Sequence, residues 1–463
     1  MGIAASLFFN TTSPSECLDW RIRPSDEQYD AQKERWKALQ GYLLADLREK
    51  SGYPISSWLQ GSYKFGTQVR PADKFQEIDI DLGVYYRWAG EPEDGAHEPP
   101  ELKDFVQDSL TAYIEQSDND AEGVSNPKPR CNRVHFADNF HIDVPSYHLD
   151  ADRDARALAT QAGGWETSDP KAIYEWWKEA IDEQARPRVR RLVRYLKMWA
   201  ALAFDDEGRP SSILLTVLVA EAYLKLESDR LNGDDEHLRE VAETIRSRLN
   251  RSRVVRNPVD SGENLNRLTV EQSDEFIEKL EILVTRADSA LAVPTKAQSA
   301  DIWSEVFHHF FPIPPEEEVL TEMSKALTPV LFEPEIHVTA TAPNEPQRLF
   351  RGLNSIGPIP KDCAIEFSLV NGQELPLGAV VMWTVRNAGK EAEHENDLGH
   401  PVGSGLTAQE RSAYTGRHFM DVSVRLNGMM IGHRRVPVTI YGVGLPKRNP
   451  ARPDWVKFRQ KRR

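Results

Sequence analysis

Two aspartates at alternate positions of a strand-like run are the residues best suited to do chemistry. Asp79 and Asp81 lie in the run EIDIDLGVYY, which alternates polar and apolar residues from Glu77 onward. Side chains at positions i and i+2 of a strand emerge on one face of a sheet, so these carboxylates are expected side by side. Adjacent carboxylates repel each other unless a cation lies between them. Divalent cations that prefer oxygen ligands suit such a pair.

A third carboxylate, Asp143, lies in a second alternating run, NFHIDVPSYH, which can pair beside the first run. Three carboxylates can hold two metal ions, one activating an attacking hydroxyl and the other steadying a leaving pyrophosphate. The sequence therefore predicts that Asp79, Asp81 and Asp143 bind two Mg²⁺ ions, with Mn²⁺ as a substitute.

A glycine-bearing turn, GSYKFGT, ends twelve positions before Asp79. Its glycines have no Cβ, so backbone amides of the turn can approach a triphosphate closely, and its serine can donate to a phosphate oxygen. Alone, a Gly–Ser pair is often an ordinary turn, and an acidic pair is often a solvated strand face. Together with the third aspartate they favour a nucleotide site. The nucleotide-binding residues predicted in this turn are Gly61, Ser62, Gly66 and Thr67.

Helices and strands must position these groups. Helical spacing of apolar residues predicts one long amphipathic helix over 26–50 and another helix over 101–116. Strand-like runs RCNRVHFA and NFHIDVPSYH are separated by a turn at Asp138–Asn139. From residue 169 the pattern becomes helical. The predicted helices are 170–183, 188–204, 212–226, 235–250 and 270–290.

Beyond about residue 330 the pattern changes to short β-branched runs separated by Gly, Pro or Asn. Several short strands separated by such turn-forming residues predict a small β-sandwich. The runs that carry this prediction are 364–367, 380–385, 420–426 and 436–441.

Composition limits the classes of function. A chain of 463 residues is long enough for two or three domains. A net charge of -15 disfavours non-specific binding of nucleic acid by the whole surface. Three widely spaced cysteines argue against a disulfide framework and favour the reducing cytoplasm. We expect neither a membrane span nor a secretory signal.

The motifs GSYKFGT, DIDLGVY and HIDVP together resemble the DNA polymerase β-like nucleotidyltransferases, and within them the cGAS/DncV-like group, the SMODS branch of bacterial antiphage signalling. The resemblance spans roughly residues 20–312. It implies a palm-like α/β core followed by a helical half, with nucleotides bound in the cleft between them. It also implies that nucleoside triphosphates, ATP among them, are joined into a cyclic or short linear oligonucleotide that reaches a downstream effector.

One face of a predicted helix is basic. Arg190, Arg194 and Lys197 follow one another at i, i+4 and i+7, a spacing that suits contact with triphosphates. A solvated basic face is an equal alternative. The resemblance assigns Lys197 to the lysine that contacts the donor nucleotide.

Two further segments match the resemblance. Ser211 and Ser212 resemble the helix start where a family serine touches phosphate, and helix N-terminal amides favour anions in any case. Asn264 lies in a stretch that resembles the loop near the nucleotide. A turn built from Asn, Pro and Gly explains that stretch equally well.

The C-terminal region carries a second resemblance. The runs WTVRNAG from Trp383, NDLGH from Asn396 and YTGRHFM from Tyr414 are similar to the adenylyl/guanylyl and SMODS C-terminal sensor domain. That resemblance implies a domain that binds a ligand and controls the linked cyclase. Sandwich turns and core residues explain most of the same positions.

The predicted fold is α+β: a polymerase β-like palm plus a helical lobe, followed by a small β-sandwich. The domains are a nucleotidyltransferase core with its N-terminal long helix, a helical lobe that completes the cleft, a linker, a sensor-like sandwich and a basic tail. Their boundaries are 1–168, 169–312, 313–329, 330–446 and 447–463.

The predicted function is a Mg²⁺-dependent synthase of a cyclic di- or oligonucleotide in antiphage (CBASS-like) signalling. Two alternatives stay open. One is a nucleotidyltransferase that modifies a macromolecule, such as a tRNA end or a protein hydroxyl. The other is an inactive nucleotide sensor, although a pure binder has no need of all three aspartates.

Overall fold

The computed structural model describes residues 2–72, 76–116, 119–137, 139–314, 332–342, 345–427 and 429–442. The chain divides into two compact units, Met1–Pro329 with Glu393–Asp397, and Val330–Ala392 with Leu398–Arg463. Most of the predicted linker at 313–329 and all of the basic tail at 447–463 lie outside the described residues. The finer boundary at residue 168 stays a prediction.

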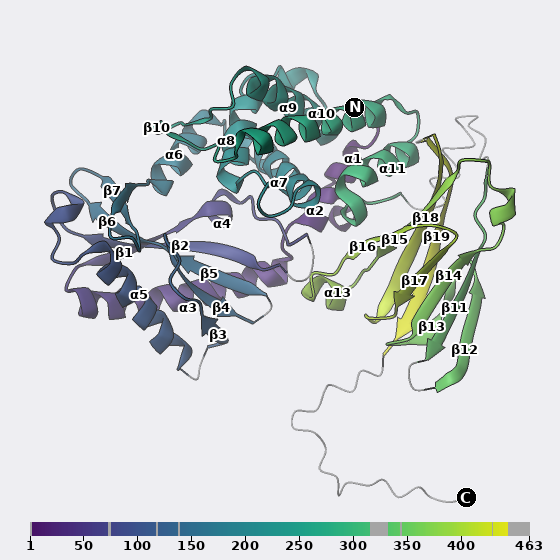
Figure 1. The fold of residues 1–463 in the computed structure, drawn as a ribbon, viewed down its shortest axis with the longest axis horizontal. Helices are drawn as coiled ribbons and strands as arrows, with labels where there is room; N and C mark the ends of the chain where they lie inside the picture. The colour runs from purple at the N-terminus through teal and green to yellow at the C-terminus, as the bar shows by residue number, and fades with distance from the viewer. Residues whose placement is uncertain are drawn as a thin grey trace, which may run out of the picture. The chain divides into compact units, whose positions relative to one another are not determined.

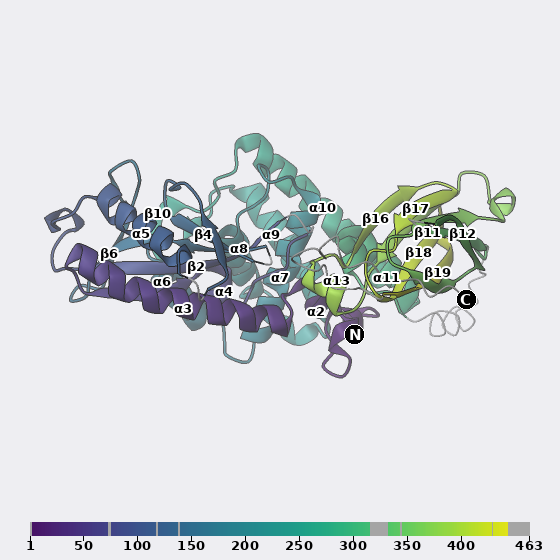
Figure 2. The same cartoon turned by 90° about the horizontal axis from the view of Figure 1, so that it is seen from below.

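The predicted long helix is confirmed as α3 (Asp26–Ser51), which runs along one face of the first unit (Figure 2). Ser25 begins it with a capping box: the Ser25 hydroxyl accepts from the Gln28 N–H, and the Gln28 side chain accepts from the Ser25 N–H. Gly52 ends the helix with a φ of 74°, a left-handed conformation that glycine adopts without steric cost.

Eight of the described strands form one sheet in the first unit (Figure 1). At its centre β2 pairs in parallel with β5 and β6, which follow each other on either side of Pro145. The two pairings keep one register, Asp81 with Asp143 and Val84 with Ser146, so the predicted strand NFHIDVPSYH continues past the proline. The strands are β1 (Ile55–Gln60), β2 (Ile78–Arg87), β3 (Ala121–Val124), β4 (Asn132–Phe136), β5 (Phe140–Val144), β6 (Ser146–Asp150), β7 (Ala155–Ala159) and β8 (Trp165–Thr167).

Alternation along β2 decides which face of the sheet carries the core. Ile78, Ile80 and Leu82 are buried in one apolar cluster together with residues of α3 and of α5 (Pro99–Ile114). Asp79 and Asp81 lie between them in the strand and therefore point to the opposite face. The helices cover one face of the sheet and leave the carboxylates on the other.

The second half of the first unit is helical, and all five predicted helices are confirmed. A further helix, α11, was not predicted. The helices are α6 (Pro170–Ala180), α7 (Arg186–Ala203), α8 (Ser212–Tyr223), α9 (Asp234–Arg251), α10 (Val270–Ala292) and α11 (Lys296–Phe307).

The N-terminal segment also belongs to this helical half. It forms α1 (Ala5–Phe8) and α2 (Leu18–Ile22) before the long helix begins. The Phe8 ring is fully buried and meets the rings of Tyr195 and Trp303 edge-on. Sequence patterning places no constraint on such a short segment, so this packing was not predicted.

The second unit contains two β-sheets whose inner faces share one core. Phe367 from the four-stranded sheet contacts Trp383 from the five-stranded sheet, with ring centroids 6.4 Å apart. The predicted β-sandwich and the α+β class are thus confirmed. The first sheet holds β11 (Ile336–Ala342), β12 (Glu345–Leu353), β14 (Ala364–Leu369) and β17 (Thr407–Arg411), and the second holds β13 (Ile356–Pro360), β15 (Val380–Arg386), β16 (Gly399–Ser404), β18 (Gly416–Leu426) and β19 (Met429–Tyr441).

Within the described part of the chain, none of the helices combines the length and the apolar character needed to cross a bilayer.

Candidate active site

The structure brings the three predicted carboxylates together. Asp79 and Asp81 lie on β2, and Asp143 lies on β5. In the parallel pairing Asp81 is opposite Asp143, and Asp79 is opposite His141. Neighbouring strands are about 4.8 Å apart, so the side chains of Asp81 and Asp143 start from adjacent points on one face.

The charged form of Asp81 is destabilised by its surroundings. Burial raises the pKa of Asp81 to about 7, and the negative charges of Asp79 and Asp143 contribute to the rise. The positive charges of Lys197 and Arg133 oppose it. An aspartate in water titrates near 4, so the charged form of Asp81 is destabilised here and gains from any additional cation.

Asp143 is held by an arginine from the adjacent strand. Arg133 on β4 is paired with Asp143 in the antiparallel register, and its Nε and Nη2 donate to the two carboxylate oxygens at 2.6 and 2.8 Å. Burial alone would raise the pKa of Asp143, but this two-point ion pair outweighs it and lowers the pKa below its usual value. Asp143 therefore remains charged, with both oxygens engaged.

The three carboxylates provide the kind of ligand atoms that a divalent cation prefers. Three carboxylates offer oxygen ligands only, and the mutual repulsion at Asp81 is what a metal ion would relieve. As they stand, the described residues contain no group of three or more His, Cys, Asp or Glu side chains arranged to hold a metal. Each oxygen of Asp143 accepts one hydrogen bond from Arg133 and keeps a second lone pair that could ligate an ion.

Lys197 lies between the carboxylates and the glycine turn. Its ammonium donates to the carbonyl oxygen of Thr67 at 3.2 Å and is within 3.4 Å of the Thr67 hydroxyl. Burial lowers the pKa of Lys197 to about 8, and the charges of Asp79 and Asp81 limit the fall. The lysine predicted to meet the donor nucleotide is thus at the site and contacts the turn.

The glycine turn lies directly against Asp81. Gly61 has a φ of 56°, and a Cβ added there would be 2.0 Å from the Asp81 Oδ2 atom. The turn continues as the one-turn helix α4 (Gly61–Phe65) and closes where the Thr67 N–H donates to the Ser62 carbonyl oxygen at 2.9 Å. Only glycine allows the backbone this close to the carboxylate.

The two arginines predicted to meet triphosphates with Lys197 contact the turn. The Arg190 Nε donates to the carbonyl oxygen of Phe65 at 2.9 Å, and the Arg194 Nη1 donates to that of Gly66 at 2.7 Å. Their contact with triphosphates stays a prediction.

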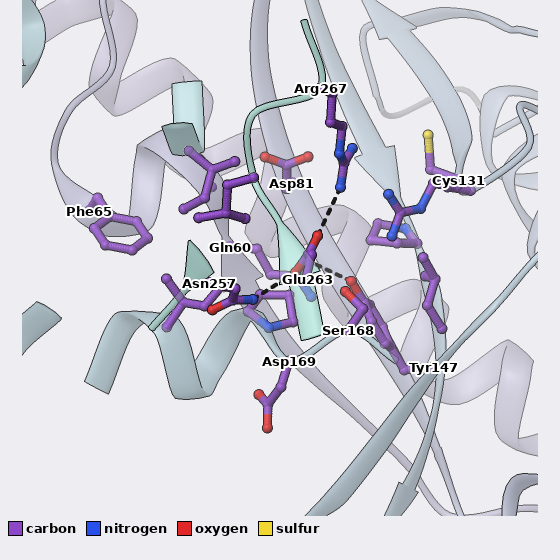
Figure 3. Close-up of a pocket in the computed structure, with 18 residues that line it drawn as sticks. Gln60, Phe65, Asp81, Cys131, Tyr147, Ser168, Asp169, Asn257, Glu263 and Arg267 are labelled. Carbon is purple, nitrogen blue, oxygen red and sulfur yellow. Dashed lines mark hydrogen bonds and ion pairs between the residues drawn. The ribbon is translucent and has the colours of Figure 1, made fainter. Parts of the chain in front are cut away.

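A cavity of about 360 Å³ adjoins Gly61 and Asp81 (Figure 3). Its polar wall includes residues of the hairpin formed by β9 (Arg256–Asn257) and β10 (Asp260–Asn264). The Glu263 carboxylate accepts from the Asn257 Nδ2 at 2.7 Å and pairs with Arg267 at 3.1 Å. The volume and mixed lining suit a nucleoside.

Sequence reasoning missed most of this wall. Among the residues lining the cavity, Arg130, Tyr147, Glu263 and Arg267 were not predicted. The stretch that forms the hairpin resembles the loop near the nucleotide, but only Asn264 was predicted to bind there, because a turn pattern does not show which of its side chains line a cavity. The Glu263–Arg267 spacing of four was the available hint.

The remaining predicted residues differ in their placement. Ser211 caps α8, where its hydroxyl accepts from the Leu214 N–H at 3.4 Å, and Ser212 is the exposed first residue of that helix. The neighbouring Ile213 lines the cavity. Asn264 does not line it, because its side chain bonds to the backbone of Val255 and Asn266.

Two family models match the chain. The model described as "Cyclic GMP-AMP synthase DncV-like, nucleotidyltransferase domain" matches residues 56–147, which include all three aspartates and the glycine turn. The model described as "Adenylyl/Guanylyl and SMODS C-terminal sensor domain" matches residues 317–441.

Individual relatives agree with these matches. A cyclic GMP-AMP synthase of Escherichia albertii is 28% identical over 449 residues, covering 94% of this chain and 96% of the relative. A c-di-GMP synthase of Roseivirga ehrenbergii is 25% identical over 301 residues, covering 58% of this chain and 77% of the relative.

Among solved structures, the Vibrio cholerae dinucleotide cyclase in complex with GTP and 5MTHFGLU2 has a similar fold, with a TM-score of 0.56. The match covers 67% of this chain and 97% of that protein at 21% identity. At this identity the likeness is one of fold, and together with the nucleotidyltransferase model matched at residues 56–147 it confirms the predicted fold class.

Proposed function

We propose that this chain, which matches the DncV-like nucleotidyltransferase model and the C-terminal sensor-domain model, joins nucleoside triphosphates into a cyclic di- or oligonucleotide. The observation that carries the proposal is the meeting of Asp79, Asp81 and Asp143 beside the glycine turn and the cavity. The names of the relatives support ATP and GTP as the substrates.

In this proposal Asp79, Asp81 and Asp143 hold two Mg²⁺ ions, for which Mn²⁺ can substitute. The ions, when bound, would activate an acceptor ribose hydroxyl and neutralise charge on the departing pyrophosphate. The oxygen-only donor set and the unrelieved repulsion at Asp81 support this assignment.

The chain's own groups bind and orient the donor nucleotide. Gly61 brings the backbone close to Asp81, and the hydroxyl of Ser62, the next residue, would donate to a phosphate oxygen. Lys197 supplies positive charge beside the carboxylates, and the hairpin residues Asn257 and Glu263 face the nucleoside. Catalysis then rests on positioning and on charge neutralisation.

We further propose that the product is a signal in antiphage (CBASS-like) defence and acts through a downstream effector. The sensor-like second unit would bind a ligand of its own that controls synthesis. The match of residues 317–441 to the sensor-domain model supports a regulatory role for that unit.

The direct test is to incubate the purified chain with all four nucleoside triphosphates and Mg²⁺ or Mn²⁺, followed by mass spectrometry. We expect pyrophosphate release and a small oligonucleotide that resists phosphatase. The double variant Asp79→Asn/Asp81→Asn should lose at least roughly a hundredfold in rate, because the charge that binds the metal ions is gone.

Circular dichroism of the double variant should match that of the wild type. A matched control is Asp120→Asn, which changes an exposed carboxylate that pairs with Arg35 and is not among the residues lining the cavity. Turnover by the double variant would reject the assignment. Label transferred to tRNA or to a protein hydroxyl would favour the macromolecule-modifying alternative.

A further inference from the structure

Three cationic side chains of α7 reach three consecutive carbonyl oxygens of the glycine turn. Arg190, Arg194 and Lys197 donate to the carbonyls of Phe65, Gly66 and Thr67, in that order. The spacing i, i+4 and i+7 lays these side chains along one face of the helix, so the turn lies parallel to it. The carbonyl side of the turn is therefore fixed to α7.

The turn has little means of holding this position by itself. Its helix α4 is a single turn, Gly61–Phe65, and helices this short are unstable without outside contacts. Gly66 adopts a φ of 68°, and a Cβ there would be 3.3 Å from the Arg190 Nε. The contacts with α7 thus restrain the end of the turn, together with the packing of the buried Phe65 ring against Tyr174 and Trp177.

Arg194 is itself held from the other side. Asp19 in α2 accepts from the Arg194 Nη2 at 2.5 Å and from its Nε at 3.0 Å, and the exposed fractions of the two side chains are only 11% and 12%. Nη1 donates to Gly66, and Nε and Nη2 donate to Asp19, so each nitrogen of the guanidinium has a partner within the protein.

The segment that carries Asp19 is anchored at further points. The Arg70 N–H donates to the Ile22 carbonyl at 2.8 Å, and the Arg70 side chain donates to the Arg23 carbonyl. The Arg21 side chain donates to the carbonyls of His309 and Phe310. Asp19 therefore presents its carboxylate to Arg194 from a well-supported backbone.

We propose that Arg194, oriented by Asp19, is a positioning residue for the phosphate-binding turn of the nucleotidyl-transfer reaction. This rests on the proposed function. Arg194 does not touch the nucleotide; it holds the Gly66 carbonyl toward α7 so that the opposite side of the turn stays directed at the cavity. This role differs from direct contact with a triphosphate, which the spacing of the three cationic residues on α7 suggests when taken alone.

The test compares Arg194→Gln, Arg194→Lys, Asp19→Asn and the double variant Asp19→Asn/Arg194→Gln. We expect Arg194→Gln to lower kcat/KM for nucleoside triphosphate roughly ten- to hundredfold, chiefly by raising KM, because a small displacement of a binding element has effects of that size. Arg194→Lys should recover part of the loss, since lysine keeps the charge but cannot reach Gly66 and Asp19 together.

The Asp19→Asn variant separates the two roles by the sign of its effect. If Arg194 positions the turn, Asp19→Asn weakens nucleotide binding, and the double variant is no worse than Arg194→Gln alone. If Arg194 binds triphosphate directly, freeing it from Asp19 leaves binding unchanged or tighter, which would overturn the proposal. The matched control is the exposed pair Arg239–Asp288 on the same helical half, where Asp288→Asn should change neither KM nor kcat.

Hydrogen exchange without nucleotide supplies a readout that does not depend on the reaction. The N–H groups of Gly66 and Thr67 are bonded within the turn, and we expect about tenfold faster exchange there in Arg194→Gln and Asp19→Asn. Unchanged exchange and unchanged KM in both variants, with the wild type active, would overturn the proposal. Faster exchange in a chain that transfers no nucleotide would reject the proposed function and leave the positioning of the turn supported.

Discussion

At the scale of single residues, the carboxylates of the site differ in how well nearby positive charge balances their negative charge. Both oxygens of Asp143 accept from Arg133, whereas burial and two like charges destabilise the charged form of Asp81, and the positive charges of Lys197 and Arg133 offset this only in part. The uncompensated charge is therefore concentrated at Asp81. Asp81 is also the residue against which the glycine turn is packed, so in the proposed function the metal ions and the phosphates would meet the backbone of the turn beside this carboxylate.

Gly61→Ala tests this convergence. The new Cβ would be 2.0 Å from the Asp81 Oδ2, and the φ of 56° is unfavourable for alanine by about 1 to 2 kcal/mol. We expect the turn to move away from Asp81, with a loss of roughly a hundredfold in kcat/KM and a much smaller loss of stability. Steady-state kinetics and thermal unfolding measure the two effects.

Gly41→Ala is the control for that prediction. Gly41 lies inside α3 with no atom within 4 Å of the position of an added Cβ. The substitution should leave the kinetics unchanged and stabilise the helix by about 0.5 to 1 kcal/mol. Full activity in Gly61→Ala would show that the close approach of turn and carboxylate is not needed.

At the scale of elements, local patterning predicted the parts of the site that lie on regular structure. The alternation of Ile and Asp in β2 placed apolar residues on the helix-covered face and Asp79 and Asp81 on the other. The match between the runs around Asp81 and Asp143 suggested that their strands pair, as the register shows. Period-two patterns are reliable here because one face of the sheet must be buried.

Patterning could not predict contacts that depend on which distant residues meet. Arg133 was inside a predicted strand, yet its pairing with Asp143 follows from antiparallel register, which a local pattern does not determine. Arg194 reads as a surface cation until Asp19 and Gly66 are placed around it. Its helix was predicted, but the burial of its basic face by another segment was not.

The docking of the N-terminal segment leads to a stability prediction. Phe8 is fully buried among aromatic rings, and the Tyr195 hydroxyl donates to its carbonyl oxygen at 3.0 Å. Replacing Phe8 by Ala leaves a cavity among rings that cannot all close in, at a cost of about 3 to 5 kcal/mol. Urea unfolding should show this as a lower midpoint for the first unit.

The adjacent Phe9 provides the control. It is 38% exposed, and its main contact is the Arg191 guanidinium, 3.8 Å from the ring centroid. Phe9→Ala should cost about 1 kcal/mol or less. Equal effects of the two substitutions would mean that the aromatic cluster around Phe8 does not hold the segment in place.

At the scale of the whole molecule, the chain consists of two units with separate cores, and only the first carries the three aspartates. The second unit has a buried charge network of its own. Asp421 on β18 is paired with Arg386 on β15 and with Arg435 on β19, whose Nε donates to it at 2.8 Å. This network joins three adjacent strands of one sheet.

Asp421 makes the stability of the second unit dependent on pH. Burial alone would raise the pKa of Asp421, but the charges of Arg435 and Arg386 outweigh it and hold the pKa well below its usual value. An aspartate in the unfolded chain titrates near 4, so the unfolded state takes up the proton first as the pH falls. The stabilisation is complete above about pH 5 and is lost progressively as the pH falls through 4 toward the folded-state pKa.

The variant Asp421→Asn should separate this contribution from general acid denaturation. At pH 7 it leaves two buried arginines without their carboxylate, at a cost of about 3 to 5 kcal/mol. Between pH 5 and pH 3 its unfolding temperature should fall less steeply than that of the wild type, because the titrating group is gone. Scanning calorimetry of the full chain across this range measures both effects.

Glu333→Gln, which removes an exposed partner of Arg434, should behave like the wild type at every pH. An equally steep acid dependence in Asp421→Asn would assign the pH response to other carboxylates.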